Sequence, residues 1–156
     1  MENRKEGAPS LALILSHVSL PPALRRLDCV AMVNDSFPCV LVVDDNEDVR
    51  YCLASILSLS GYAILQAGNG QEALAVVEEH GFPHAIVLDL NMPVMDGYAF
   101  LEHRAAHPDL SCVPVLVISG AVDSEQARAH GATDCLAKPV AIPILLDALT
   151  SLLDPC

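Results

Sequence analysis

The sequence predicts an α/β fold, a doubly wound sandwich in which helices cover both faces of a five-stranded parallel sheet. Two observations support this prediction. From residue 38 onward, short β-branched runs alternate five times with helical patterns. Parallel strands need crossover connections, and right-handed crossovers place helices on both faces. The 156 residues, of which 53% are hydrophobic, also suit one domain that buries a core without disulfides or metal.

The first predicted unit is a strand over 39–43 followed by a helix over 48–61. "CVLVV" is a β-branched run typical of a buried strand, whereas apolar residues of the next segment recur with helical spacing. Gly61 is expected to end that helix. The predicted inner stripe of the helix consists of Val49, Leu53, Ile56 and Leu57.

The second and third units follow the same order. "YAILQA" at 62–67 predicts a strand, and an Asn-Gly turn leads into a helix over 69–81. "AIVLD" at 85–89 predicts the third strand, and after a loop the pattern predicts a helix over 97–107.

The fourth and fifth units complete the sheet. "VPVLVIS" at 113–119 predicts a strand, and 124–131 a short helix. "DCLA" at 134–137 predicts a brief last strand, followed by a final helix over 141–153.

Polar side chains stand at the carboxyl ends of these strands, the edge where doubly wound folds gather functional groups. They are Asp44 and Asp45 after the first strand, Asp89 after the third, Ser119 at the fourth and Lys138 after the fifth. If the first and third strands are neighbours, three carboxylates meet, and their repulsion weakens the fold unless a cation joins them. Such an all-oxygen site suits Mg²⁺, with Mn²⁺ as a substitute.

The same edge also carries groups that suit a phosphoryl ligand. Lys138 brings a mobile positive charge and Ser119 brings a hydroxyl donor. Together with a metal ion, these groups form a cradle for a phosphoryl group carried by one of the carboxylates.

Four motifs in order make residues 38–154 resemble a response-regulator receiver domain of bacterial two-component signalling. They are "VLVVDDNEDVR", "DLNMPVMDG", "VISG" and "LAKPV". The resemblance implies a chemotaxis-regulator-like, flavodoxin-like single domain with strand order 2-1-3-4-5. It also implies a cis bond between Lys138 and Pro139.

The resemblance also implies a role for each site residue. By position, Asp89 is the phosphoacceptor and a metal ligand, and Asp45 is a direct metal ligand. Asp44 is a metal-site carboxylate that acts largely through water, and the backbone carbonyl of Asn91 is a further metal ligand. Ser119 is the conformational switch, and Lys138 is the cation that binds the phosphoryl group.

Some of these residues also have a purely structural interpretation. Asp44 suits a cap of the first helix, and Asp89 suits a loop position paired with Lys138. In "MDG", Asp96 and Gly97 are interpreted as turn chemistry, with Gly97 at positive φ.

Two departures from the family pattern affect the expected output surface. Cys135 stands where most receivers carry an aromatic residue, three positions before Lys138. The segment from Ser119 to Lys138 is also about one helical turn shorter than usual, so the fourth helix should be short. The phosphorylation chemistry is untouched by either change.

The leading functional hypothesis is a stand-alone receiver that accepts a phosphoryl group on Asp89 from a histidine kinase or histidine phosphotransfer protein. It would assist its own phosphorylation and dephosphorylation, and would signal to an unknown protein target, because the chain stops at Cys156 without an effector domain. Alternatives are a receiver-like scaffold without regulated phosphorylation and a phosphorelay intermediate. A hydrolase with an aspartyl-phosphate intermediate is disfavoured, because such enzymes usually set nucleophile and acid two residues apart on one strand.

Charge and cysteine usage limit the partners. Residues 1–36 hold four of the 20 acidic and four of the 8 basic residues, so the remainder carries the whole excess of negative charge. That argues against direct nucleic-acid binding. No apolar run approaches the roughly 18 residues of a membrane span, and six cysteines without zinc-type spacing suggest reduced thiols in the cytoplasm.

The domain boundaries are predicted as an extension over 1–36, loosely ordered, and a receiver over 37–156. Residues 1–31 contain three prolines and no sustained periodicity, so we expect them to be loosely attached, with Met32 as a candidate start. The run "LALIL" at 11–15 could instead dock on a sheet edge or on a partner.

Overall fold

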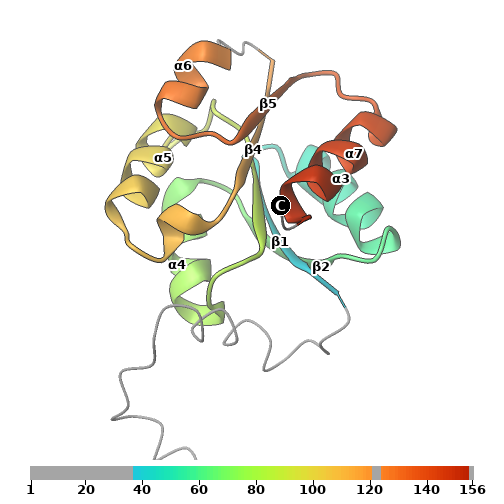
Figure 1. Cartoon of the computed structure of the whole chain (residues 1–156), viewed down its shortest axis with the longest axis horizontal. Coiled ribbons are helices and arrows are strands. Elements are labelled where there is room, and N and C mark those ends of the chain that lie inside the picture. The colour runs from blue at the N-terminus through green and yellow to red at the C-terminus, as the bar shows by residue number, and fades with distance from the viewer. Residues whose placement is uncertain (1–36, 121–123, 155–156) are drawn as a thin grey trace, which may run out of the picture.

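A computed structural model describes residues 37–120 and 124–154 and confirms the doubly wound fold (Figure 1). The expected extension over 1–36 lies outside the described residues. No helix within the described ranges is both long enough and apolar enough to cross a bilayer.

The sheet has five parallel strands in the order β2-β1-β3-β4-β5, as predicted. The strands are β1 (Cys39–Val43), β2 (Ala63–Ala67), β3 (Ala85–Leu88), β4 (Val115–Ser119) and β5 (Asp134–Ala137). Val43 pairs with Leu88, so the carboxyl ends of β1 and β3 are level. The residues that follow these two strands therefore emerge side by side.

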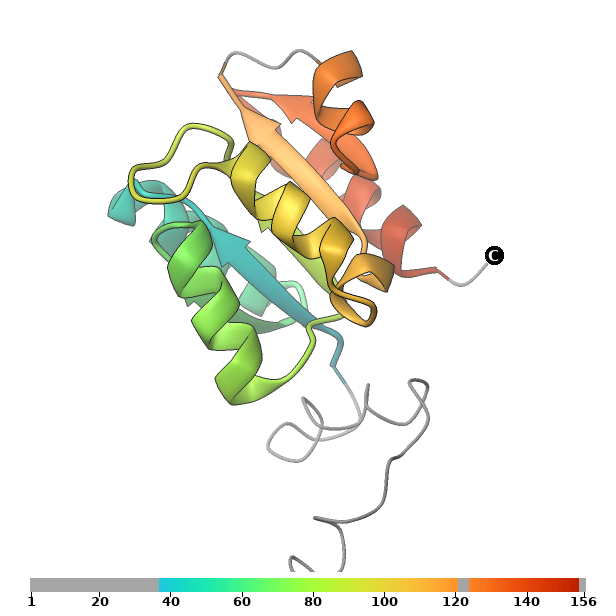
Figure 2. The ribbon, with the colours of Figure 1, turned by 90° about the vertical axis from the view of Figure 1, so that its left-hand side faces the viewer.

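Helices cover both faces of the sheet. They are α3 (Glu47–Leu59), α4 (Gly70–His80), α5 (Gly97–Ala106), α6 (Ser124–Ala129) and α7 (Ile142–Leu153), with a 3₁₀ helix η3 (Leu110–Cys112) that the sequence analysis did not predict. Figure 1 shows α4, α5 and α6 on one side of the sheet and α3 and α7 on the other, and Figure 2 shows α4 and α5 in front of the strands. The short α6 agrees with the predicted short fourth helix.

Alternation along the strands divides the core into two layers. Leu41 and Val43 of β1 pack with the α4 and α5 side, whereas Val40 and Val42 pack with the α3 and α7 side. Both sets are buried, because a parallel sheet covered on both faces has no solvent side.

The helix α3 differs in detail from its predicted stripe. Leu57 is fully buried, but the other three predicted members are only half-buried. Ala54 is buried instead, three residues before Leu57, because the helix lies close enough to β1 and β2 that a small residue fits against them. Gly61 follows the helix at φ 92°, the left-handed conformation typical of a helix end.

The expectation of a positive φ at Gly97 is wrong. Gly97 is absent from the glycines with positive φ in the described ranges, and its requirement is steric. A Cβ at this position would lie 2.6 Å from the carbonyl oxygen of Asp89 and 2.7 Å from Cα of Leu90. Asp96 caps α5, since its side chain accepts the backbone N–H of Ala99 at 2.8 Å. The "MDG" motif thus holds the Asp89 loop close against the start of α5.

Arg104 is a buried base that connects three segments. Its side chain is 7% exposed and donates to the carbonyl oxygens of Val113 at 2.6 and 3.0 Å, Ser111 at 2.8 Å and Gly131 at 3.2 Å. Burial lowers the pKa of the Arg104 guanidinium, because it removes the charge from water. The residue stabilises the connection from η3 to β4 and the turn before β5.

We predict that Arg104→Ala lowers the free energy of unfolding by about 2–3 kcal/mol, because it leaves buried carbonyl groups without donors. Arg128→Ala is the matched control. It removes an exposed 2.9 Å ion pair with Asp134 and should cost less than about 1 kcal/mol. Urea unfolding of both variants measures the difference, and equal losses would show that the Arg104 hydrogen bonds do not stabilise the fold.

Candidate functional site

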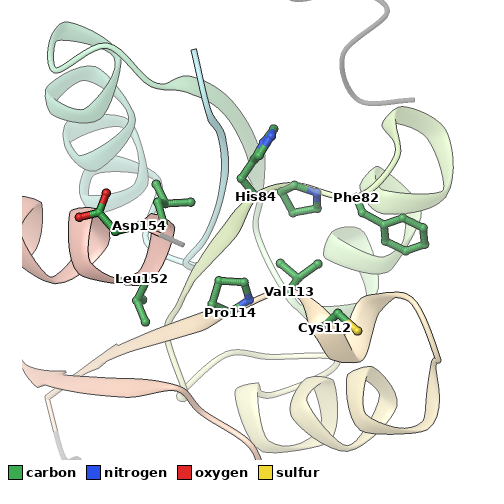
Figure 3. A pocket seen from close by; sticks show the side chains of 9 residues that line it. Phe82, His84, Cys112, Val113, Pro114, Leu152 and Asp154 are labelled. Carbon is green, nitrogen blue, oxygen red and sulfur yellow. The ribbon is translucent and has the colours of Figure 1, made fainter. Parts of the chain in front are cut away.

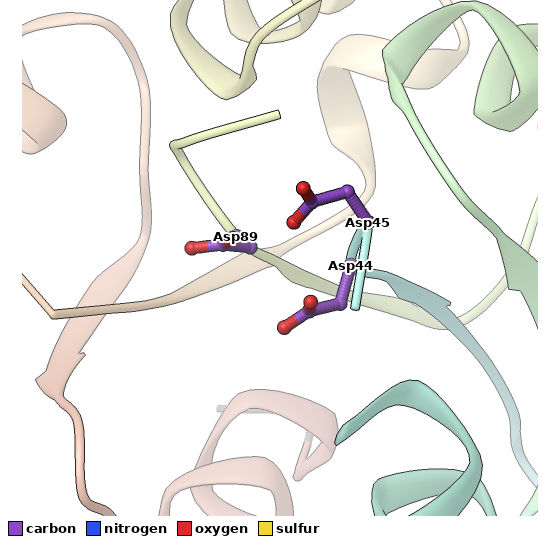
Figure 4. A group of neighbouring side chains, drawn as sticks. All are labelled: Asp44, Asp45 and Asp89. Atoms are coloured by element: carbon purple, nitrogen blue, oxygen red, sulfur yellow. The ribbon is translucent and has the colours of Figure 1, made fainter. Parts of the chain in front are cut away.

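Three carboxylates meet at the carboxyl edge of the sheet. Asp44 and Asp45 follow β1 and Asp89 follows β3, as Figure 4 shows. One oxygen from each lies within 4.8 Å of the others. Asp44 and Asp89 are 2% and 7% exposed, whereas Asp45 is exposed. The predicted meeting of the three acids is therefore present, with one of them open to solvent.

Both oxygens of Asp44 have partners. Oδ1 accepts the backbone N–H of Asn46 at 2.9 Å, and Oδ2 accepts Nζ of Lys138 at 2.8 Å. The cap of α3 is Asn46, whose side chain accepts the N–H of Val49. The alternative interpretation of Asp44 as the helix cap is thus wrong.

Asp89 is held less tightly than Asp44. Its Oδ1 accepts the backbone N–H of Leu90 at 2.9 Å and lies 3.7 Å from Nζ of Lys138. Burial raises the pKa of the Asp89 carboxyl, the ammonium of Lys138 opposes this, and the charge of Asp44 adds to the increase. The net direction is upward, so ionised Asp89 is a destabilised carboxylate.

Lys138 supplies the positive charge at this edge. Burial alone would lower the pKa of its ammonium, but the hydrogen bond to Asp44 and the charges of Asp44 and Asp89 raise it above its usual range. The backbone N–H of Lys138 donates to the carbonyl oxygen of Ser119 at 3.0 Å, which ties β5 to the end of β4. The bond between Lys138 and Pro139 is cis, as the resemblance implied.

Ser119 has a buried hydroxyl group that lacks a partner. The residue is 0% exposed, and its Oγ has no hydrogen-bond partner within the described part of the chain. A buried donor without an acceptor costs about 1–3 kcal/mol. This position therefore suits a hydroxyl that bonds to a ligand, since none of the residues that the structure describes accepts from it or donates to it. Such a cost distinguishes Ser119 from an ordinary serine at a strand end.

Asn91 lies two residues beyond Asp89 in the same loop and is exposed. Its backbone N–H acts on the carboxylate of Asp89 and lowers its pKa, against the larger effect of burial. The expected role of the Asn91 carbonyl as a metal ligand stays a prediction.

Sequence reasoning missed Arg50. Its Nη1 donates to the backbone carbonyl of Asp44 at 2.7 Å, so the first turn of α3 stabilises the loop that carries the acidic pair. The scarcity of basic residues in this domain could have drawn attention to Arg50, which lies six residues after Asp44. Its partner is a backbone carbonyl, however, and because every residue has one, the sequence shows no pairing of residue types.

The residues at this edge fit a divalent cation. Three carboxylate oxygens within 4.8 Å of one another, one of them on an exposed residue, form a hard-oxygen site open to water. The ammonium of Lys138, the residue after β5, lies 2.8 Å from Asp44 and 3.7 Å from Asp89, and Ser119 ends the neighbouring strand β4 at the same edge of the sheet. Chemically, such an edge can hold a metal ion, a nucleophilic carboxylate and two donors for an anionic group.

Comparisons with known proteins identify the family and the fold. Residues 40–150 match the model of a family described as the response regulator receiver domain. The transcriptional regulatory protein PrrA of Mycobacterium tuberculosis is 43% identical over 120 residues, which cover 74% of this chain and 50% of PrrA. The response regulator receiver protein Anae109_2439 of Anaeromyxobacter is 39% identical over 109 residues, covering 69% of this chain and 45% of that protein.

A solved structure has the same fold. The chemotaxis response regulator CheY4 of Vibrio cholerae superposes with a TM-score of 0.70 at 32% identity, covering 76% of this chain and 100% of that one. This chain spans about half the length of the curated relatives that it matches, or less.

We predict that Asp89→Asn raises Tm of the protein in a chelating buffer at neutral pH. A raised pKa means that the ionised carboxyl costs stability, and this cost is present above the folded-state pKa and absent at low pH. The increase should be about 2–4 °C and should shrink as the pH is lowered toward about 4. Calorimetry measures it, with exposed Asp147→Asn as control. A lower Tm for Asp89→Asn would contradict the direction assigned to Asp89.

Proposed function

This chain belongs to the response regulator receiver domain family, and from that premise we propose that it accepts a phosphoryl group on Asp89 from a histidine kinase or histidine phosphotransfer protein and signals through protein contacts. The observation that carries the proposal is the surroundings of Asp89. A destabilised carboxylate lies beside the acid pair of Asp44 and Asp45 and the ammonium of Lys138, at the edge where β4 ends in Ser119, whose buried hydroxyl has no partner among the described residues. A carboxylate placed only for stability would not need these neighbours.

In the proposed mechanism, an oxygen of Asp89 attacks the phosphorus atom of a phosphoimidazole. The bond from phosphorus to the imidazole nitrogen breaks, and an acyl phosphate forms on Asp89. Lys138 then pairs with a phosphoryl oxygen, which its present distance of 3.7 Å from Asp89 allows after a small movement. The hydroxyl of Ser119 donates to another phosphoryl oxygen and gains the partner that it lacks.

Asp45, Asp89 and the carbonyl of Asn91 would hold Mg²⁺ directly, and Asp44 through water. When bound, Mg²⁺ neutralises negative charge where the carboxylates and the phosphoryl group approach one another. Asp44 already shares its Oδ2 with Lys138, which suits a role through water better than a direct bond. The exposed carboxylate of Asp45 has no such competing partner among the ion pairs of the described residues.

Attack of water on the phosphorus atom of the acyl phosphate breaks its bond to the Asp89 oxygen, which releases inorganic phosphate and returns Asp89 to its carboxylate. The protein is thus a phosphoacceptor that assists its own phosphorylation and dephosphorylation, and it acts on no separate substrate. We propose a cytoplasmic location. Cys52, Cys112 and Cys135 are free thiols in the described part of the chain, which supports a reducing compartment.

Output in this proposal runs through the Ser119 and α6 region. Movement of the Ser119 hydroxyl toward the phosphoryl group shifts the end of β4. Cys135 replaces the aromatic residue that follows this movement in most receivers. It is half-buried on β5, and burial raises the pKa of its thiol. A thiol is too small to report the movement as a ring does, so α6 carries the change.

Two relatives of different length bear on the proposed stand-alone role. CheY4 is covered by this chain over its whole length, which supports a receiver acting without a further domain. PrrA, named a transcriptional regulatory protein, is about twice as long as the matched region. The expectation of no direct nucleic-acid contact therefore rests on the acidic charge of this chain alone. A scaffold without regulated phosphorylation and a phosphorelay intermediate are the alternative roles.

We predict that the protein incubated with Mg²⁺ and acetyl phosphate gains one phosphoryl adduct, which intact-mass spectrometry detects. Asp89→Asn should abolish the adduct, because it removes the nucleophilic oxygen. Asp96→Asn, a change to the nearby cap of α5, should retain it.

Two outcomes would contradict the proposal. An undiminished adduct in Asp89→Asn would place the phosphoryl group elsewhere, and no adduct on the unaltered chain, with acetyl phosphate or with a phosphorylated kinase, would favour the scaffold. Transfer of the adduct to a histidine phosphotransfer protein would identify the relay role.

A further inference from the structure

A groove lies at the amino edge of the sheet, opposite Asp89. Residues 82–84, 112–114 and 152–154 line it, and its volume is about 340 Å³ (Figure 3). Phe82, Val113, Pro114, Leu152 and Leu153 supply an apolar lining. His84, Cys112 and Asp154 add polar groups to the lining, and an open groove that combines apolar and polar side chains is typical of a binding surface.

The groove and the acidic site stand at opposite ends of the same strands. His84 precedes β3 and Asp89 follows it, while Pro114 precedes β4 and Ser119 ends it. A strand of four residues spans about 13 Å. An occupant of the groove therefore leaves Asp89 accessible, and the groove is independent of the phosphorylation chemistry proposed above.

The described chain begins beside this groove. The backbone N–H of Cys39, the first residue of β1, donates to Nδ1 of His84, which lines the groove, at 2.9 Å. The residues before Cys39 thus enter the fold at the groove rather than at the acidic edge. Residues 1–36 are attached at that point and have the shortest path to this surface.

The sequence of residues 1–36 contains an occupant of suitable chemistry. Residues 11–15, "LALIL", are five consecutive apolar residues of aliphatic type. Twenty-one residues separate them from Phe37. A flexible chain of that length has a root-mean-square span of about 25 Å, which is enough to reach the groove and keeps the effective concentration high.

We infer that residues 11–15 dock in the groove formed by 82–84, 112–114 and 152–154, so that the extension covers the amino edge of its own receiver domain. Docking removes an aliphatic run from water and fills an apolar groove. The occupant is intramolecular, so its affinity depends on no partner and on no protein concentration.

The test uses the reactivity of Cys112 in the full chain. Cys112 is exposed and lines the groove, whereas Cys52 is exposed on α3 and serves as the internal reference. Alkylation by a maleimide is followed at each cysteine by peptide mass spectrometry. Leu13→Asp should accelerate labelling of Cys112 about tenfold, a change equivalent to about 1.4 kcal/mol. Ser16→Asp adds the same charge outside the apolar run and should leave the rate unchanged.

Three outcomes overturn the inference. The first is an equal labelling rate of Cys112 in the unaltered chain and in Leu13→Asp, and the second is an equal acceleration of that rate by Ser16→Asp. The third is protection of Cys112 that increases with protein concentration, which would indicate that a second copy of the chain occupies the groove. Acceptance of a phosphoryl group by Asp89 should be the same in all variants, so a failure here is distinguishable from a failure of the proposed function.

Discussion

The site depends on one shared charge. Asp44 and Asp89 are almost fully buried, and Nζ of Lys138 lies 2.8 Å from the first and 3.7 Å from the second. A buried charge costs several kcal/mol unless it is paired and hydrogen-bonded. One ammonium cannot fully compensate two buried carboxylates, so burial, with a smaller contribution from the charge of Asp44, raises the pKa of the Asp89 carboxyl although Lys138 opposes the change. This imbalance is the physical reason that the edge suits a divalent cation and a phosphoryl group.

The fold creates this imbalance through register and close packing. The level ends of β1 and β3 bring Asp44 beside Asp89, and the pairing of Ser119 with Ala137 brings Lys138 to the same edge. Gly97 lets the loop after Asp89 lie against α5, because any side chain there would collide with the backbone of Asp89. Arg104, on the same helix, holds the start of β4 through backbone carbonyls. The stability of the core thus offsets the cost of the charged edge.

Much of this was predictable because it depends on residue type and period. β-branched runs gave the strands, and carboxylates at strand ends gave the site, since parallel strands place their carboxyl ends at one edge. Details that depend on distance were not predictable. Ala54 is buried in α3, although larger residues of the same helix were expected to form its buried stripe. Gly97 is required because a side chain would collide with the backbone of Asp89 and Leu90, and not because of its φ angle. The hydrogen bonds of Arg50 and Arg104 go to backbone carbonyls, which any sequence provides. The sequence likewise could not show that the buried hydroxyl of Ser119 has no partner among the residues that the structure describes.

Calorimetric titration with Mg²⁺ tests the central claim most directly, because it measures whether the three carboxylates form a cation site. Asp45→Asn is the most informative variant, since Asp45 is exposed and its removal leaves the ion pairs of Lys138 intact. The unaltered chain and Asp147→Asn should bind Mg²⁺ with the same affinity, and Asp45→Asn should bind at least about tenfold more weakly, a loss of about 1.4 kcal/mol. Unchanged affinity in Asp45→Asn would contradict the account, because the cation would then bind somewhere other than this edge.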